Sequence, residues 1–314
     1  MVIRHLETAG FDFVRFNTEE FPQKVLLEMW MKNGQIHGAL RFPERAVEIG
    51  SISCVWNRRP HKPEIDPRVA TEAVRSWAEE ESYQGLQILW SLIEDRFWLN
   101  SMETTARIDF NKWLQMKAAA EVGLTTPPSL MTNNPAAALM FWQEQDLAIA
   151  LKAIKQEVIR YPEQRKPFMI TTKKLGVAEM KPENLEKVAV TPVFLQRYIE
   201  KEKELRITVV GNQIFSCEID SQQMSTTQED WRAHIFEGNQ PPLKPCILPA
   251  AIGNKCLKLL AKLDLSFGCI DMIVTPQNNY VFLEVNPNGQ WAWVEQQTGL
   301  PISTAIAQLL ACYA

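Results

Sequence analysis

The sequence has no closely spaced cysteine pair and no long apolar run. Its six cysteines are scattered over the chain, at Cys54, Cys217, Cys246, Cys256, Cys269 and Cys312. Without a CxxC pair they indicate neither a zinc site nor a dense disulfide framework, so we expect free thiols in a reducing compartment. No stretch approaches the roughly 18 apolar residues of a membrane-spanning helix, and the N-terminus lacks the apolar core of a signal peptide. We therefore expect a cytoplasmic protein.

The chain also lacks an excess of positive charge. Its formal net charge is -4 at pH 7, from 33 Lys and Arg against 37 Asp and Glu. This balance gives no general attraction to nucleic acid or to anionic lipid, so we expect neither as a partner. With 314 residues, 46% of them hydrophobic, the chain is long enough for two or three globular domains.

The N-terminal third has an α/β pattern, which predicts a domain of residues 1–100. The expected elements are a helix at 2–10, a strand at 11–17, a hairpin around Asn33–Gly34, a strand at 52–60 and a helix from Val69 to Ile93.

A second pattern starts at Asp109, with a helix that stops at Gly123. Helix and strand segments then continue to about residue 190, and the remainder is rich in strands. We expect a central domain of residues 101–190 and a C-terminal domain of residues 191–314, with an overall α/β (α+β) fold.

Charged residues interrupt two apolar strands near the C-terminus. The segments FGCIDMIVT (267–275) and YVFLEVN (280–286) are separated by PQNN, which predicts an antiparallel hairpin. If Thr275 faces Tyr280, Asp271 lies opposite Glu284, and Asn286 shares their face. The other face, directed to the core, then carries Ile270, Met272, Val274, Val281, Leu283 and Val285.

Opposed carboxylates destabilise a strand pair unless a cation lies between them or one of them has a raised pKa. Two carboxylates and the amide oxygen of Asn286 are hard ligands that suit Mg²⁺, which commonly shares its shell with substrate phosphates. With a different register, Asp271 and Glu284 simply face solvent at a sheet edge. The hairpin alone leaves both interpretations open.

The order and spacing of several motifs resemble those of ATP-grasp ligases. An Asp followed about a dozen residues later by ExN resembles their metal-binding end. The segment NKWLQMKAAAEVGLTTPPSLMTN resembles the start of their nucleotide domain, with a phosphate-binding lysine at Lys112, and AIALKAI resembles the strand with the second such lysine, Lys152. The segment LQRYIEKEKELRITVVG is similar to the adenine-binding hinge, followed by a ribose-side acid and a phosphate-side arginine. By this resemblance these residues are Gln196, Arg197, Tyr198 and Ile199, then Glu204 and Arg206.

Within the ATP-grasp ligases, the chain resembles the graspetide synthetases, which are microviridin-type maturases of ribosomal peptides (RiPPs). The motifs that carry this likeness are VWNRRP, FWLNSMETTARIDFNKWLQMKAA, LRITVVGNQIF, DWRAH and EVNPNGQW. The resemblance implies ATP and Mg²⁺ as cofactors, a precursor peptide of leader plus core as partner, and a possible homodimer. Arg232, in DWRAH, would stabilise the acyl phosphate or the oxyanion. Members have a strand before the helix that opens this chain, so we expect the pre-ATP-grasp domain to lack its first strand.

Two other functions remain open from the sequence. One is an ATP-grasp ligase that adds free amino acids to a protein or metabolite. The other is a non-catalytic nucleotide-binding regulator, which is favoured by the absence of glycine from residues 155–167, where many ATP-grasp lids carry it.

Individual residues also have duller interpretations. Lys112 could be a solvated lysine at a helix start, Arg206 with Glu204 a surface ion pair, and Arg232 part of an exposed loop. Trp291 and Trp293 could pack in the core or border the peptide acceptor. Residues 171–192 could be a plain surface helix or a docking surface for the leader.

Overall fold

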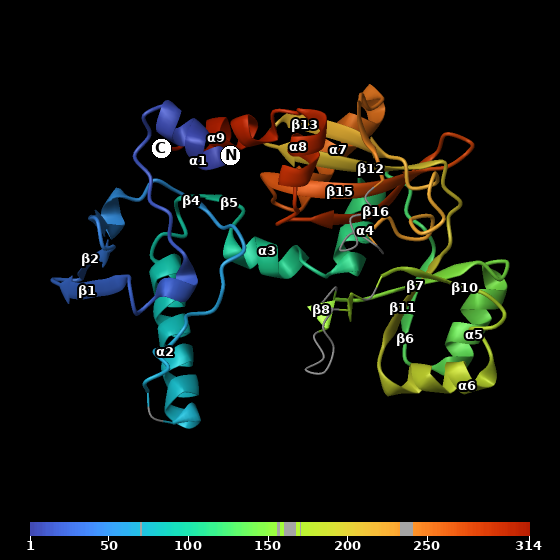
Figure 1. The fold of residues 1–314 in the computed structure, drawn as a ribbon, viewed down its shortest axis with the longest axis horizontal. Coiled ribbons are helices and arrows are strands. Elements are labelled where there is room, and N and C mark those ends of the chain that lie inside the picture. The colour runs from blue at the N-terminus through green and yellow to red at the C-terminus, as the bar shows by residue number, and fades with distance from the viewer. Residues whose placement is uncertain (70, 156–157, 160–167, 170, 233–240) are drawn as a thin grey trace. The chain divides into compact units, whose positions relative to one another are not determined.

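The structure is a computed structural model that describes residues 1–69, 71–155, 158–159, 168–169, 171–232 and 241–314. It divides into two compact units. The first, called here the terminal unit, is Met1–Glu103 with Ser303–Ala314, and the second, the central unit, is Thr104–Ile302. In Figure 1 the terminal unit runs from blue to cyan and includes the red C-terminal helix, and the central unit runs from green through yellow to red.

The terminal unit confirms the predicted hairpin. Strands β1 (Leu26–Lys32) and β2 (Gln35–Arg41) pair antiparallel, and Asn33 and Gly34 make the turn with φ of 53° and 77°. Glycine and asparagine adopt this left-handed backbone at low cost. Strand β3 (Ala46–Glu48) completes the sheet. The strand expected at 11–17 is wrong, since these residues have no regular structure and lead into a short 3₁₀ helix, η1 (Thr18–Glu20).

A long helix packs against this sheet, since Leu86 and Leu89 share a buried cluster with Leu40 of β2. Helix α1 (Val2–Thr8) opens the chain, and α2 (Glu72–Ser91) is capped by the Thr71 side chain, which accepts a hydrogen bond from Val74 N. The smaller elements are η2 (Ile49–Ser51), β4 (Cys54–Trp56), which pairs parallel with β5 (Phe97–Leu99), and α9 (Ile302–Ala311). Helix α2, at 20 residues, is the longest in the described ranges, but no helix there is long and apolar enough to cross a membrane.

A five-stranded antiparallel sheet forms the larger half of the central unit, in the order β14-β13-β12-β15-β16. Its strands are β12 (Lys203–Val210), β13 (Gln213–Ile219), β14 (Leu243–Cys246), β15 (Phe267–Val274) and β16 (Tyr280–Asn286). Helices α4 (Lys112–Glu121) and α7 (Ala250–Lys262) pack on one face, where Ile207, Ile270 and Met272 are fully buried. Helices α3 (Met102–Ile108) and α8 (Ala292–Thr298) complete this half.

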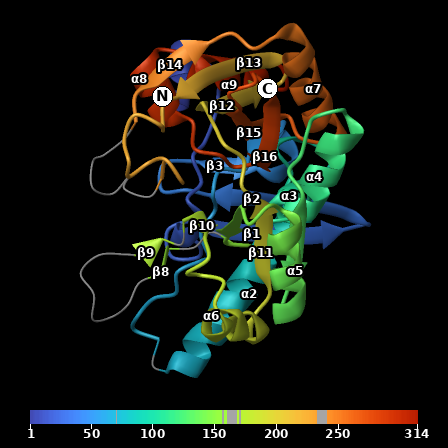
Figure 2. The same cartoon turned by 90° about the vertical axis from the view of Figure 1, so that its right-hand side faces the viewer.

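A four-stranded sheet forms the other half, in the order β10-β7-β11-β6. Its strands are β6 (Ser129–Thr132), β7 (Ile149–Lys152), β10 (Lys173–Leu175) and β11 (Val193–Arg197). Helices α5 (Pro135–Glu144), α6 (Pro182–Leu185) and η3 (Glu186–Val190) cover one face, as Figure 2 shows, and bury Ile149 and Leu195. The strands β8 (Val158–Ile159) and β9 (Phe168–Met169) pair beside them.

The β15–β16 hairpin differs from the predicted register at its turn but not at its acids. Tyr280 faces Val274 rather than Thr275, and a β-bulge after Asp271 then restores the pairing of Asp271 with Glu284. A bulge places two residues of one strand opposite one of the other. Phe282 therefore enters the core in place of the expected Val281 and Leu283.

Candidate active site

A row of charged side chains crosses three neighbouring strands of the large sheet. Arg206 on β12 lies opposite Asp271 on β15, which lies opposite Glu284 on β16. The Nη1 of Arg206 donates to both carboxylate oxygens of Asp271, at 2.8 and 3.0 Å, and only 8% and 12% of these side chains are exposed. The repulsion expected between the two acids is therefore offset by a buried guanidinium on the next strand.

Two further cations reach Glu284 from outside its sheet. The Lys112 ammonium donates to Oε2, and Arg232 Nη1 lies 3.3 Å from Oε1. Burial raises the pKa of the Glu284 carboxyl, but the charges of Lys112 and Arg232 outweigh it and hold that pKa well below its usual range. Glu284 is therefore ionised at neutral pH.

Helix α4 places Lys112 against β16. The Asn111 side chain caps the helix by accepting from Leu114 N, and Lys112 is the first helical residue. One turn later, Gln115 Oε1 accepts from Val285 N at 3.0 Å, which ties the edge strand β16 to the helix. Lys112 is 11% exposed, so the interpretation as a solvated lysine is wrong.

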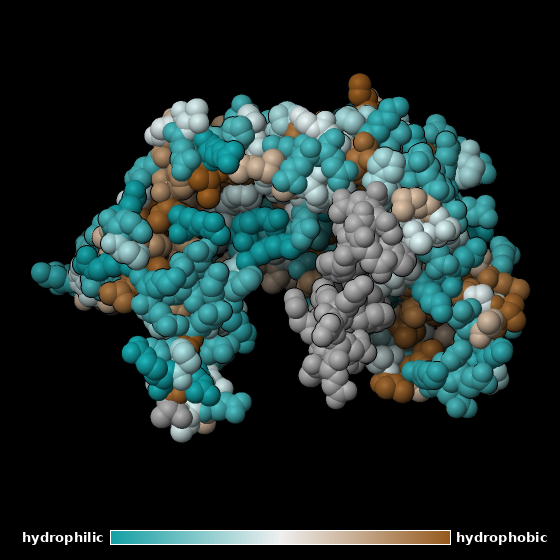
Figure 3. All heavy atoms as spheres, in the orientation of Figure 1, coloured by the Kyte–Doolittle hydropathy of each residue, from teal (hydrophilic) through white to brown (hydrophobic). Residues whose placement is uncertain are grey.

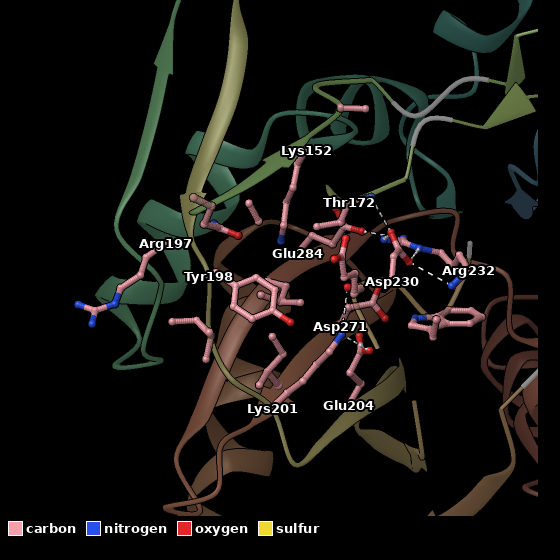
Figure 4. Close-up of a pocket in the computed structure, with 18 of the residues that line it drawn as sticks. Lys152, Thr172, Arg197, Tyr198, Lys201, Glu204, Asp230, Arg232, Asp271 and Glu284 are labelled. Carbon is pink, nitrogen blue, oxygen red and sulfur yellow. Dashed lines mark hydrogen bonds and ion pairs between the residues drawn. The ribbon is translucent and has the colours of Figure 1, made fainter. Parts of the chain in front are cut away.

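Arg232 is held by an acid two residues before it. Asp230 accepts from the Arg232 backbone N, Nε and Nη2, at 3.1, 2.9 and 3.3 Å. Burial raises the pKa of the Asp230 carboxyl, but Arg232 outweighs it and lowers that pKa to about 2. Figure 4 shows Asp230 between Arg232 and Thr172. Arg232 is 23% exposed and packs over the Trp231 ring, so it is not a freely exposed loop residue.

Lys152, at the end of β7, extends into the same pocket and points toward Glu284 (Figure 4). Burial lowers the pKa of its ammonium from 10.5 to about 8. An ammonium in a pocket is a favourable partner for an anionic group of a ligand.

The predicted hinge begins on β11, the strand paired with β7, and also lines the pocket. The Gln196 side chain is buried and donates to Ser129 Oγ at 3.0 Å. The backbone N–H groups of Arg197 and Tyr198 donate to the carbonyls of Pro128 and Ala148, so an adenine would have to contact other backbone groups of this segment. The Arg197 side chain points away from the other labelled residues in Figure 4.

Glu204 forms a buried ion pair that the sequence did not indicate. Its Oε1 accepts from Lys201 Nζ at 2.7 Å, and the two side chains are 10% and 4% exposed. Burial outweighs Lys201 and raises the pKa of the Glu204 carboxyl. The interpretation as a surface pair of Arg206 with Glu204 is wrong, because Arg206 pairs with Asp271 instead.

One pocket brings together most of the predicted site. It is lined by Lys112, Lys152, Gln196, Arg197, Tyr198, Ile199, Glu204, Arg232, Asp271 and Glu284. Arg206 and Asn286 are not on its wall. The Asn286 Oδ1 accepts from Asn288 N at 2.9 Å, which closes an Asx turn at the end of β16. Its role as a metal ligand stays a prediction.

The donors around Asp271 and Glu284 fit Mg²⁺ by their chemistry. Both side chains carry hard carboxylate oxygens on one face of the hairpin, and Asn286, opposite Cys269, shares that face. Among the described residues no group of three His, Cys, Asp or Glu could hold a metal alone. Sparse protein ligation of this kind is typical of Mg²⁺, which keeps waters and takes phosphate oxygens.

Three charged residues of the pocket were not predicted from the sequence, namely Lys201, Glu229 and Asp230. The motif DWRAH directed attention to its arginine alone, although an acid two residues before an arginine is itself a signal of a local ion pair. Lys201 and Glu204 are three residues apart, and only the turn into β12 brings them together.

Lys152 gives a testable pH dependence. We expect an amine-directed reagent such as trinitrobenzenesulfonate to label it half-maximally near pH 8, well below the 10.5 of an ordinary lysine. ATP with Mg²⁺ should protect it. Between pH 8 and 10.5 the unfolded chain binds the proton that folded Lys152 has lost, so this residue makes stability rise with pH. Peptide mapping across pH checks this, and labelling only above pH 10 would contradict it.

Comparisons with known proteins show the family of the chain. The family model of the MvdD pre-ATP grasp domain matches residues 1–106, and that of the RimK-like ATP-grasp domain matches residues 111–310. No curated protein sequence matches the chain. Among solved structures, it is similar to a RiPP-associated ATP-grasp ligase from Chryseobacterium gregarium, in complex with ADP and a leader and core peptide. The identity is 30%, with 100% of this chain and 92% of that chain covered and a TM-score of 0.90.

The macrocyclase MdnC from Microcystis aeruginosa, bound with the precursor peptide MdnA, is 30% identical at a TM-score of 0.83, with 99% of this chain and 94% of that one covered. The macrocyclase MdnB from the same organism is also 30% identical, at a TM-score of 0.78, with 98% and 93% covered. The chain therefore belongs to the ATP-grasp ligases, and within them to the microviridin-type peptide maturases that its motifs resemble.

Proposed function

We propose that the chain joins side chains of a ribosomal precursor peptide, using ATP to activate an Asp or Glu carboxylate. The product is an intramolecular ω-ester with Ser or Thr, or an ω-amide with Lys. The observation that carries this proposal is the convergence of Lys112, Lys152 and Arg232 on the paired acids Asp271 and Glu284, in one pocket. Similarity to ligases bound with precursor peptides supports the choice of substrate.

The reaction proceeds in two steps that conserve atoms. A carboxylate oxygen of the peptide attacks the γ-phosphorus of ATP, the bond to the β–γ bridging oxygen breaks, and ADP leaves. A hydroxyl or amine of the same peptide then attacks the acyl carbon, loses its proton, and displaces phosphate. The sum is the loss of one water from the peptide and the conversion of ATP to ADP and phosphate. Such chemistry depends mainly on positioning and charge neutralisation.

Different residues of the pocket have different roles in this reaction. Lys112 and Lys152 bind phosphate oxygens, the hinge from Gln196 to Ile199 contacts adenine, and Glu204 the ribose. Arg232 stabilises charge on the acyl phosphate, and Arg206 contributes to the phosphate side through the row that it forms with Asp271.

Asp271, Glu284 and Asn286 are the residues that would hold Mg²⁺. A bound Mg²⁺ neutralises charge on the phosphates. The ion pairs of Glu284 with Lys112 and Arg232 keep these cations within reach of the same phosphates.

The leader of the precursor peptide would dock on the surface around α6. Hydrophobic side chains gather over this part of the molecule in Figure 3. Val177 and Val190 are 70% and 83% exposed, and Met140 on α5 is 58% exposed. We propose that these side chains contact apolar residues of the leader.

A mass spectrum of a candidate precursor peptide tests the proposal. After incubation with the protein, ATP and Mg²⁺, we expect the peptide to lose the mass of one water per crosslink, with one ADP released for each. A gain of an amino-acid residue mass would instead identify a ligase that adds free amino acids. An unchanged peptide without ADP release would identify a nucleotide-binding regulator.

Three further features belong to the same proposal. A homodimer is supported by the edge strand β1, whose Trp30 and Met31 are 51% and 70% exposed, because an unpaired strand edge is a template for association. Light scattering at several protein concentrations measures the fraction of dimer.

A cytoplasmic location is supported by the six free cysteines. We also propose three domains, of residues 1–100, 101–190 and 191–314.

A further inference from the structure

Asp230 is a buried acid without an assigned role, and it lies beside Arg232, the arginine proposed to stabilise the acyl phosphate. Only 4% of its surface is exposed, and its carboxylate accepts four hydrogen bonds. Three come from Arg232, from the backbone N, Nε and Nη2. The fourth comes from the backbone N of Thr172 at 2.9 Å.

The bonds to Arg232 fix the direction of its guanidinium. With Nε and Nη2 on the carboxylate of Asp230, the planar group has Nη1 directed to Glu284, 3.3 Å away. A guanidinium is rigid and planar, so anchoring one edge determines where its remaining donors point. The ring of Trp231 lies 5.8 Å from the guanidinium carbon and packs against it.

The bond to Thr172 connects this arginine to the other half of the central unit. Thr172 immediately precedes β10, and Glu229 Oε2 accepts from the backbone N of Lys174 within β10, at 3.1 Å. Residues 229 and 230 therefore join the segment of Arg232 to the edge of the four-stranded sheet. Lys152, the second phosphate lysine, lies on the neighbouring strand β7 of that sheet.

The same local motif occurs elsewhere without these connections. Asp66 accepts from the backbone N and the Nε of Arg68, at 2.8 and 3.0 Å. The Arg68 side chain is 89% exposed, against 23% for Arg232. An Asp-x-Arg sequence thus forms this contact by itself, and burial and the bond to Thr172 distinguish Asp230.

We propose that Asp230 is a positioning residue of the active site. It orients the guanidinium of Arg232 toward Glu284 and links the segment of Arg232 to β10. Arg232 and Lys152 can then bind the same phosphoryl group. The inference rests on the proposed function for its activity readout, but its geometric part does not.

The experiment combines a kinetic cycle with a direct measurement of the side chain. Asp230→Asn should lower kcat for ADP formation with ATP, Mg²⁺ and precursor peptide by about 10- to 100-fold, as removal of a partner of an active-site ligand does, with KM for ATP changed by less than about threefold. In an Arg232→Lys background the same substitution should lower kcat by less than about threefold, because the effects of substitutions at residues that act together are not additive.

The NMR signal of the Arg232 Nε–H, assigned by its absence from Arg232→Lys, should be sharp in the wild type and broadened or lost in Asp230→Asn. Asp66→Asn is the matched control and should leave kinetics and this signal unchanged. Asp230→Glu keeps the charge and should retain part of the kcat that Asp230→Asn loses. It replaces Asp230→Asn in the experiment if that variant does not fold.

Equal losses in both backgrounds, or an unchanged Nε–H signal in Asp230→Asn, would overturn the proposal. A wild-type protein that leaves the peptide unmodified would contradict the proposed function alone, since the Nε–H signal still decides whether Asp230 orients Arg232.

Discussion

Glu284→Gln is expected to lower ATP-dependent modification of the precursor peptide by at least about 100-fold while the chain still folds. The amide keeps the size of the side chain but removes the charge that Lys112 and Arg232 share. It also removes a hard anionic ligand for Mg²⁺. ADP release in the presence of the peptide measures the effect, and full activity would remove Glu284 from the proposed metal site.

The same substitution should destabilise the protein in the absence of ATP. In this variant Lys112 and Arg232 lose the anionic partner that they share, in a pocket that also contains Lys152. Because 20% of the Glu284 side chain is exposed, we expect a loss of about 2 kcal/mol in the free energy of unfolding, below the roughly 3–5 kcal/mol of a fully buried pair. Denaturant titration measures it.

Glu121→Gln is the matched control for stability. Glu121 pairs with Lys262 at the surface, with 42% and 44% of the side chains exposed, so its loss should cost far less stability than the loss of Glu284. Equal costs at both positions would show that the charges around Glu284 are screened by solvent and that its pairing is not special.

The pairing of Asp271 with Glu284 was predictable because two strands with alternating apolar residues and a short turn restrict the register. The turn length and the bulge that together produce this pairing were not predictable. The turn was predicted one residue too short, and the bulge after Asp271 corrected the offset. Packing decides such a bulge, since it brings Phe282 into the core, and a single sequence carries no local signal for it.

The neutralisation of these acids could not be predicted for a related reason. Their partners are Arg206 on the adjacent strand and Lys112, which is 172 residues away from Glu284 in the chain. Spacing within one segment detects helix and strand neighbours, but contacts between distant segments depend on tertiary structure. A weak signal did exist at Lys112, because a cation in the first turn of a helix opposes the helix dipole and needs a compensating anion.

Gly289→Ala is expected to be among the most destabilising single substitutions in the central unit. A Cβ at this position would lie 2.3 Å from Cys269 Cβ, 2.6 Å from its Sγ and 3.2 Å from Arg206 Nη2. The neighbouring carbonyl of Gln290 accepts from Arg206 Nη2 at 3.0 Å, so displacing it removes a partner from a buried guanidinium. Overpacking and the lost hydrogen bond together should cost about 3 kcal/mol.

Gly85→Ala provides the contrast. Apart from its chain neighbours and the backbone of α2 itself, no described atom lies within 4 Å of a Cβ at this position, and alanine should stabilise the helix by about 0.5–1 kcal/mol. Opposite signs for the two substitutions would separate steric conflict from the intrinsic preference for glycine.

A second substitution identifies the cause of the loss at Gly289. Cys269→Gly removes both atoms nearest to the added methyl group, although alone it should destabilise the buried strand β15. If steric conflict is the cause, the double variant Cys269→Gly/Gly289→Ala should be more stable than the sum of the two single costs, by about 1–2 kcal/mol of coupling energy. Additive costs would locate the defect in the turn itself, and crowding against Cys269 would then not explain why glycine follows β16.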